Sequence, residues 1–340
     1  MEVDRTAEPI WGALSPAEYG TVRTSDGFLL QYQVFPPRIA PATGEEPVLT
    51  VVLANGIGVR FPGFAMQIEH LRKNYRVVAW DYRGIGASGL AHQTIQRRGS
   101  HGSGGLRSGE KDPPHATVTP PAGEVDFSIE RHALDLLEVV DSMGIEKFAI
   151  VGWSMGVQVG LEVIRQRPSA VLAFAALFGT YGRPFHKGLP APLAEIIEGL
   201  FRVARDFSEV VGGLVKLAAW LPELSVPLLK GAGFISSETV VSLFLSNVQD
   251  VAEADHGAYL ATMSELARHN AHDMLSRITC PSLIITGSKD YLTPPAAARD
   301  MADQITDCEL MVLEGASHFG LIEPCQAIQP ALDALLRRVL

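Results

Sequence analysis

The chain of 340 residues carries 28 Lys and Arg against 38 Asp and Glu, a net charge of -10, and 47% of its residues are hydrophobic. This is the composition of an ordinary globular protein, long enough for one large domain with an insertion or for two modest domains. The acidic balance argues against a nucleic-acid-binding protein, whose surface would be basic, so we expect no nucleic-acid partner.

The cysteines and the apolar segments give the expected compartment. Cys280, Cys308 and Cys325 are scattered and lack metal-ligand spacing, so we expect free thiols and neither a disulfide framework nor a zinc site. The N-terminus lacks a basic region followed by an apolar stretch, so it does not look like a secretory signal. The most apolar long region, Val210–Phe234, is interrupted by Lys and Pro before it reaches the roughly 18 residues of a membrane span. We therefore expect a cytoplasmic protein without a membrane span.

In chain order, the first elements are strands. Thr21–Val34 contains Ser25-Asp26-Gly27 between two β-prone stretches, which predicts a hairpin. Continuous apolar runs follow, of the kind that form strands buried on both faces: VLTVVLAN from Val48, RVVAWD, FAIVGW, AVLAFAAL, SLIITG and CELMVLEG. Helical patterns lie between several of them, at Ile129–Met143 and Gln158–Gln166. Strands that alternate with helices predict an α/β fold with a parallel sheet covered on both faces.

Two regions break this alternation. Residues 90–123 are rich in Gly, Ser and Pro and cannot bury much apolar surface, which predicts a flexible insertion. Residues 180–277 are helical in pattern and carry no clear strand. We expect this second region to be an inserted helical cap, with the core formed by residues 1–179 and 278–340.

The segment Gly152-Trp153-Ser154-Met155-Gly156 follows a predicted strand and opens a helix. That context is the one a nucleophile elbow requires, in which a serine stands on a strained turn between strand and helix. Residues 152 and 156 must be small, here both glycine, because larger side chains there would collide with each other across the turn. The alternative is a structural turn on which the pattern occurs by chance.

A serine nucleophile needs a base, and the base needs an orienting acid. In this geometry the acid and the histidine follow the serine in that order. Asp290 comes just past the strand SLIITG and His318 just past the strand CELMVLEG, so both should reach the carboxyl edge of the sheet. We therefore predict the set Ser154, Asp290 and His318. Other histidines that could approach a substrate lie in the last helical part of the predicted cap: His256, His269 and His272.

An oxyanion hole requires two backbone N–H donors. Met155, the residue after the nucleophile, supplies one. The other is expected from the loop NGIGVRFPG, where Gly56 and Gly58 allow a close backbone approach, and we choose Ile57. The alternative is that Asn-Gly simply turns the chain there.

The loop WDYRGIGASG follows the next strand. We interpret Asp81 and Arg83 as structural, organising this loop by hydrogen bonds. Gly84 and Gly86 lack the spacing and the following helix of a dinucleotide fingerprint. We expect no cofactor and no bound metal.

The motifs NGIG, DYRGIGASG, GWSMG, GSKDYLTP and GASHFGLIEP, in this order, resemble the α/β-hydrolase superfamily, in its serine esterase- and lipase-like branch. The resemblance covers Thr21 to Leu340 apart from the two insertions. It implies an eight-stranded, mostly parallel sheet with an antiparallel start, flanking helices and a cap after the sixth strand. It also implies that Ser154 is the nucleophile, Asp290 the acid and His318 the base, with Ile57 and Met155 as oxyanion donors.

The chain departs from the family pattern at two positions. Asn55 stands where many relatives carry His, and Val157 stands where a second glycine often follows the elbow.

The expected function is hydrolysis of carboxylic esters of small to medium apolar substrates through an acyl-enzyme. The sequence leaves open acyl transfer, thioester hydrolysis or C–C bond cleavage by the same triad. It also leaves open a non-catalytic ligand-binding protein on this scaffold, and an apolar cap that meets a membrane surface or a partner subunit. The oligomeric state is not encoded in any motif.

Overall fold

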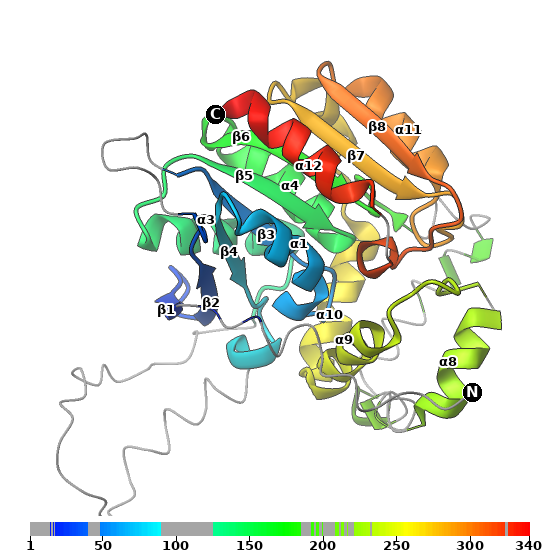
Figure 1. Ribbon diagram of the computed structural model, residues 1–340. Helices are drawn as coiled ribbons and strands as arrows, with labels where there is room; N and C mark the ends of the chain where they lie inside the picture. The colour runs from blue at the N-terminus through cyan, green and yellow to red at the C-terminus, as the bar shows by residue number, and fades with distance from the viewer. Residues whose placement is uncertain are drawn as a thin grey trace, which may run out of the picture.

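The structure is a computed structural model (Figure 1). It describes residues 14, 16, 18–39, 48–89, 125–184, 221–231, 233–323 and 326–340, together with isolated residues between 192 and 216. The predicted flexible insertion at 90–123 and Cys325 lie outside the described residues.

An eight-stranded sheet forms the centre of the molecule, in the order β1-β2-β4-β3-β5-β6-β7-β8. β1 pairs with β2 and β2 with β4 in antiparallel fashion, and the other neighbours pair in parallel. The strands are β1 (Glu18–Arg23), β2 (Leu29–Phe35), β3 (Thr50–Ala54), β4 (Arg76–Trp80), β5 (Phe148–Trp153), β6 (Val171–Leu177), β7 (Ser282–Gly287) and β8 (Cys308–Leu313). The expected mostly parallel sheet with an antiparallel start is confirmed.

The predicted hairpin joins β1 and β2. Gly27 adopts φ 85°, a left-handed conformation that favours glycine, and the Thr24 N–H donates to the Phe28 carbonyl over 2.8 Å. The turn chemistry of Asp-Gly therefore sets the register of the first strand pair.

The inner strands are apolar throughout because helices cover both faces of the sheet. In β3, Val52 and Ala54 face one core, while Val51 and Leu53 face the other. The first core is covered by α3 (Ile129–Ser142), α4 (Met155–Gln166) and α11 (Pro295–Gln304), and the second by α1 (Ala65–Leu71) and α12 (Ile328–Leu336). Side chains alternate across a strand, so a strand between two cores reads as a continuous apolar run.

The two predicted helices differ from the observed ones at their ends. α3 ends at Ser142, one residue before the predicted end, and Leu134 on its predicted apolar pattern is 36% exposed. α4 begins at Met155 and not at Gln158, because the helix starts immediately after the turn at Ser154.

Helices fill the described part of the segment between β6 and β7. They are α8 (Pro222–Gly231), α9 (Val241–Glu253), α10 (His256–Arg268) and the 3-10 helix η5 (His272–Arg277). α8, α9 and α10 gather beyond the end of the sheet to which the parallel strands point (Figure 1). The β pairing found among the described residues of this segment is a bridge between Gly182 and Asn270, which lie outside these helices. No helix within the described ranges is both long and apolar enough to cross a membrane.

Candidate active site

The backbone at Ser154 forms a sharp turn between β5 and α4. Ser154 has φ 55° and ψ -115°, a conformation that non-glycine residues rarely adopt. A Cβ on Gly152 would lie 2.4 Å from the carbonyl oxygen of Gly156, and a Cβ on Gly156 would lie 1.9 Å from the carbonyl oxygen of Ala54. Both positions must therefore be glycine, but the collision is with backbone atoms and not, as the sequence suggested, between the two side chains.

The structure brings the three predicted side chains together. Nε2 of His318 lies 2.9 Å from Oγ of Ser154, and Nδ1 of His318 lies 2.9 Å from Oδ2 of Asp290. Asp290 follows β7 and His318 follows β8, so the parallel register delivers both to the edge where β5 ends. Asp290 is 2% exposed and His318 6%, whereas Ser154 is half-buried.

Asp290 is held in place by a neighbour that the sequence analysis did not identify. The N–H groups of Leu292 and Thr293 donate to its Oδ1 over 2.9 and 2.8 Å, and the Thr293 hydroxyl donates to its Oδ2 over 2.7 Å. The Thr293 oxygen also lies 3.3 Å from Nδ1 of His318. Asp290 is thus an Asx-turn residue as well as the partner of His318. The Thr in the motif GSKDYLTP was the sequence signal from which the role of Thr293 could have been predicted.

A second set of hydrogen bonds fixes the loop that carries His318. Glu323 is buried and accepts from the hydroxyls of Ser317 (2.6 Å) and Thr239 (3.0 Å). The indole N–H of Trp153 donates to the His318 carbonyl over 3.3 Å. The histidine loop is therefore joined both to the residue before Ser154 and to the segment that leads into α9.

The two predicted oxyanion donors lie beside the serine. Met155 is the first residue of α4, so its N–H has no acceptor within the helix. Within the described part of the chain, the Ile57 N–H has no hydrogen-bond acceptor either. A Cβ placed on Gly56 would lie 3.2 Å from the Trp153 ring and 3.5 Å from Cβ of Ser154, so the residue before Ile57 lies in van der Waals reach of the serine. This geometry suits a pair of donors to an anion above Ser154.

Charged groups connect the loop that carries Ile57 to α9. The Arg60 N–H donates to Oδ2 of Asp250 on α9 over 3.1 Å, and Nε of Arg60 lies 3.5 Å from Oδ2 of the fully buried Asp81. Burial raises the pKa of Asp81 to about 6 and that of Asp250 to about 7, against the opposing effect of Arg60. α9 and the loop that carries Ile57 are thus joined through Arg60 and two carboxyl groups whose pKa values are raised by burial.

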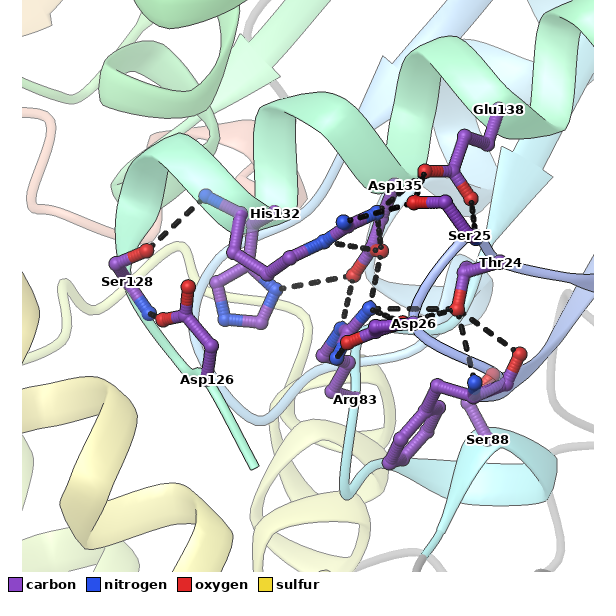
Figure 2. Close-up of polar contacts among 12 residues, drawn as sticks. Thr24, Ser25, Asp26, Arg83, Ser88, Asp126, Ser128, His132, Asp135 and Glu138 are labelled. Carbon is purple, nitrogen blue, oxygen red and sulfur yellow. Dashed lines mark hydrogen bonds and ion pairs between the residues drawn. The ribbon is translucent and has the colours of Figure 1, made fainter. Parts of the chain in front are cut away.

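Arg83 organises a separate buried cluster, shown in Figure 2. Its guanidinium is fully buried, with Nε 2.5 Å from Asp135 on α3 and Nη1 2.5 Å from Asp26 in the hairpin turn. Arg131 donates to the same Asp135 and to Glu138. Burial acts to raise the pKa of Asp26, but the hydrogen bonds from Arg83 and Thr24 outweigh it and lower this pKa. For Asp135, burial is the largest influence and raises the pKa. The cluster joins the β1–β2 hairpin to α3. Arg83 was predicted to organise its own loop by hydrogen bonds, but the partners of its guanidinium lie in the hairpin and on α3.

One group among the described residues has metal-ligand spacing: Glu130, Glu162 and His269. The side chain of Arg165 donates to both Glu162 oxygens over 3.2 and 3.0 Å, and His269 contacts Glu162 at 2.9 Å and Gln158 at 2.5 Å. The Glu162 carboxylate is therefore already paired with cationic and ring N–H partners. His269, one of the cap histidines considered as a substrate contact, instead holds the end of α10 against α4.

Comparison with known proteins identifies the family. Residues 51–329 match the model of the alpha/beta hydrolase family, and the chain belongs to this family.

Individual relatives are distant but cover nearly the whole chain. The 3-oxoadipate enol-lactonase 2 of Acinetobacter baylyi is 23% identical over 316 residues, which are 93% of this chain and 96% of the relative. Two solved structures share the fold. A hydrolase from Pseudomonas aeruginosa has a TM-score of 0.65 at 21% identity, with 95% of this chain and 99% of that one covered. The enol-lactonase from Burkholderia xenovorans LB400 has a TM-score of 0.63 at 19% identity, with 94% and 100% covered.

Proposed function

We propose that this hydrolase cleaves carboxylic esters with Ser154 as nucleophile, His318 as base and Asp290 as orienting acid. The observation that carries the proposal is the chain of two 2.9 Å contacts that runs from Ser154 Oγ through the His318 ring to Asp290. Each distance is within hydrogen-bond reach, which is the geometric requirement for a nucleophile and its base.

The mechanism follows from these positions. Nε2 of His318 accepts the Ser154 proton while Oγ attacks the ester carbonyl. The N–H groups of Ile57 and Met155 donate to the oxyanion of the tetrahedral intermediate. His318 then protonates the leaving alcohol, and afterwards activates the water that hydrolyses the acyl-enzyme. Asp290 holds the Nδ1–H tautomer and favours the imidazolium form.

The surroundings support an apolar substrate of small to medium size. Phe319, next to the base, packs against Phe234 and Phe244, with ring centroids 5.4 and 5.1 Å apart. We infer that residues 180–277 are a cap over Ser154 and that residues 1–179 and 278–340 form the core. The enol-lactonases among the relatives are named for opening a lactone, which is a cyclic ester, and we include lactones in the substrate class.

The thiols bear on the compartment. Cys280 and Cys308 are free thiols with no disulfide partner among the described residues, and burial raises the pKa of their thiols to about 11 and about 12. Such thiols are typical of a reducing compartment, and we propose that the protein works in the cytoplasm.

The test combines labelling with turnover. We expect a fluorophosphonate to label Ser154 in the folded protein, as read by peptide mass spectrometry, and p-nitrophenyl esters of rising chain length to be hydrolysed. Ser154→Ala should be neither labelled nor active. A folded protein that is not labelled at Ser154 would contradict the proposal. If Ser154 is labelled but thioesters are hydrolysed in preference to oxygen esters, the triad would serve a thioesterase. If Ser154 is labelled but the acyl group passes to an added alcohol in preference to water, the triad would serve an acyltransferase.

A further inference from the structure

α9 passes between the two loops that serve the proposed site. Phe244, near its start, packs edge-on against Phe319, the residue after His318, with centroids 5.1 Å apart. Near its end, Cγ2 of Val251 lies 3.0 Å from the position of a Cβ on Gly58, the residue after Ile57. The face of α9 between these two contacts therefore lies over two loops. One carries His318 and is called the base loop, and the other carries Ile57 and is called the oxyanion loop.

Asn247 occupies that face. It lies three residues after Phe244 and four before Val251, which places it on the same side of the helix as both. Its Oδ1 lies 3.4 Å from the position of a Cβ on Gly63, a position that also lies 3.4 Å from the Trp153 ring. The amide therefore packs against Gly63, which also lies beside the ring of Trp153, the residue before Ser154.

The amide of Asn247 is buried without hydrogen bonds. The side chain is 3% exposed, and neither Nδ2 nor Oδ1 has a hydrogen-bond partner among the residues that the structure describes. A buried polar group left unpaired costs about 1–3 kcal/mol, which is why such groups in native proteins call for an explanation. An apolar residue of the same size would avoid this cost at a position whose only task is to pack.

We propose that Asn247 is a specificity-determining residue that hydrogen-bonds a neutral polar group of the substrate, such as a hydroxyl or carboxamide, beside the scissile ester. A primary amide both donates and accepts, so one hydroxyl or carboxamide pairs with both of its unpartnered atoms. The carboxylate of Asp250, one turn further along α9, disfavours an anionic group there. This inference rests on the proposed function and narrows its substrate class to esters that carry such a group.

The experiment uses two pairs of substrates of matched shape, one pair that varies the acyl side of the ester and one that varies the alcohol side. The acyl pair is p-nitrophenyl β-hydroxybutyrate and p-nitrophenyl isovalerate, and the alcohol pair is hydroxyethyl butyrate and propyl butyrate. In each pair a hydroxyl replaces a methyl group. We expect the wild type to prefer the hydroxyl substrate of one pair by about 10-fold in kcat/KM, the effect of one hydrogen bond to a buried group.

Two variants test the recognition. Asn247→Leu keeps the volume and loses both polar atoms, so it should bring the preferred ratio close to one. Asn247→Asp keeps the shape and the acceptor for the hydroxyl proton but loses the amide donor, so it should change the ratio less than Asn247→Leu does. Gln249→Leu, on the exposed side of the same helix, should keep the wild-type ratio.

Three outcomes would overturn the inference: no preference in either pair for the wild type, an unchanged ratio in both folded Asn247 variants, or an equal loss of kcat/KM on all four substrates. Labelling of Ser154 separates this failure from that of the proposed function. If Ser154 is labelled and the apolar esters are hydrolysed, only the role of Asn247 is wrong.

Discussion

His318 lies 2.9 Å from Ser154 although 164 positions separate the two residues in the chain. The contact exists because β5 and β8 are parallel strands of one sheet, so the loops after them share an edge. Everything proposed for the chemistry depends on this edge, and the following predictions test how it is maintained.

Removing the hydroxyl of Thr293 should impair catalysis without disrupting the fold. Thr293→Val deletes the 2.7 Å hydrogen bond to Oδ2 of Asp290, the oxygen that also faces His318. A hydrogen bond to a charged group contributes about 1.5–3 kcal/mol, so we expect kcat to fall by about 10-fold or more, with an altered pH profile and little change in KM.

The matched control is Thr286→Val on β7, the strand that leads to Asp290. Thr286 is buried and its hydroxyl has no partner among the described residues, so its loss should leave kcat at the wild-type value. Equal activity of Thr293→Val and the wild type would show that the Thr293 hydroxyl does not position Asp290.

The turn at Ser154 should not tolerate a methyl group at Gly156. In Gly156→Ala the new Cβ would meet the Ala54 carbonyl oxygen at 1.9 Å, so β3 and α4 would have to separate. Overpacking of this kind costs typically about 1–3 kcal/mol, and we expect a lower Tm together with loss of fluorophosphonate labelling. Gly231→Ala on α8 is the control, because a Cβ there meets nothing within 4 Å. A Gly156→Ala protein with wild-type Tm and labelling would contradict this account of the elbow.

Breaking the buried cluster of Figure 2 should destabilise the fold strongly. Asp135→Ala leaves the guanidinium of Arg83 buried with one carboxylate fewer, and both side chains are fully buried in the wild type. Truncating one member of a buried ion pair costs about 3–5 kcal/mol, which urea unfolding would measure. Asp307→Ala removes an exposed pair with Arg338, whose side chains are 46% and 45% exposed, and should cost much less stability. Comparable losses in the two variants would refute the structural importance of the cluster.

Asp81 should make stability fall as the pH rises. Its folded-state pKa is raised from 3.8 to about 6 by burial, so the folded state binds more protons than the unfolded state between these values. The free energy of unfolding therefore decreases as the pH increases from about 4 to about 6, by at most about 1.4 kcal/mol per pH unit. Asp250, with a pKa raised to about 7, extends this fall toward neutrality.

Asp81→Asn removes the titrating group, so its stability should decline less steeply over the same pH range. Urea unfolding at about half-unit pH intervals would measure both slopes. Asp303→Asn, which changes an exposed carboxylate, should give a curve parallel to that of the wild type. Parallel curves for the wild type and Asp81→Asn would mean that Asp81 titrates alike in the folded and unfolded states.

Much of the fold could be predicted from the sequence because its signals are local. Asp26-Gly27 determines a tight turn, and uninterrupted apolar runs report strands covered on both faces. The predicted helix pattern was less exact. Leu134 is partly exposed because the face that α3 buries depends on where α4 and the sheet lie, which no periodicity within the helix contains.

The supporting residues of the site could not be assigned in this way. Thr293 was visible as a turn residue, yet its contact with Asp290 and His318 depends on the meeting of two loops. Asn247 lies on a helix between β6 and β7 whose position over the site has no local signature. Nothing in the sequence around Asp250 indicates that it accepts the Arg60 N–H, 190 positions away.

By itself, the sequence determined the order of strands and helices along the chain, the two glycines around Ser154, and the positions of Ser154, Asp290 and His318 just after β5, β7 and β8. These are consequences of backbone conformation and of chain order, which neighbouring residues encode. Only the tertiary structure decided which atoms meet. A Cβ on Gly156 would strike β3, the Thr293 hydroxyl donates to Asp290, and the Asn247 amide on α9, which has no hydrogen-bond partner among the described residues, lies between the loop of His318 and the loop of Ile57. The physical reason is that such contacts depend on the packing of elements far apart in the chain, and packing is set by all of their faces together.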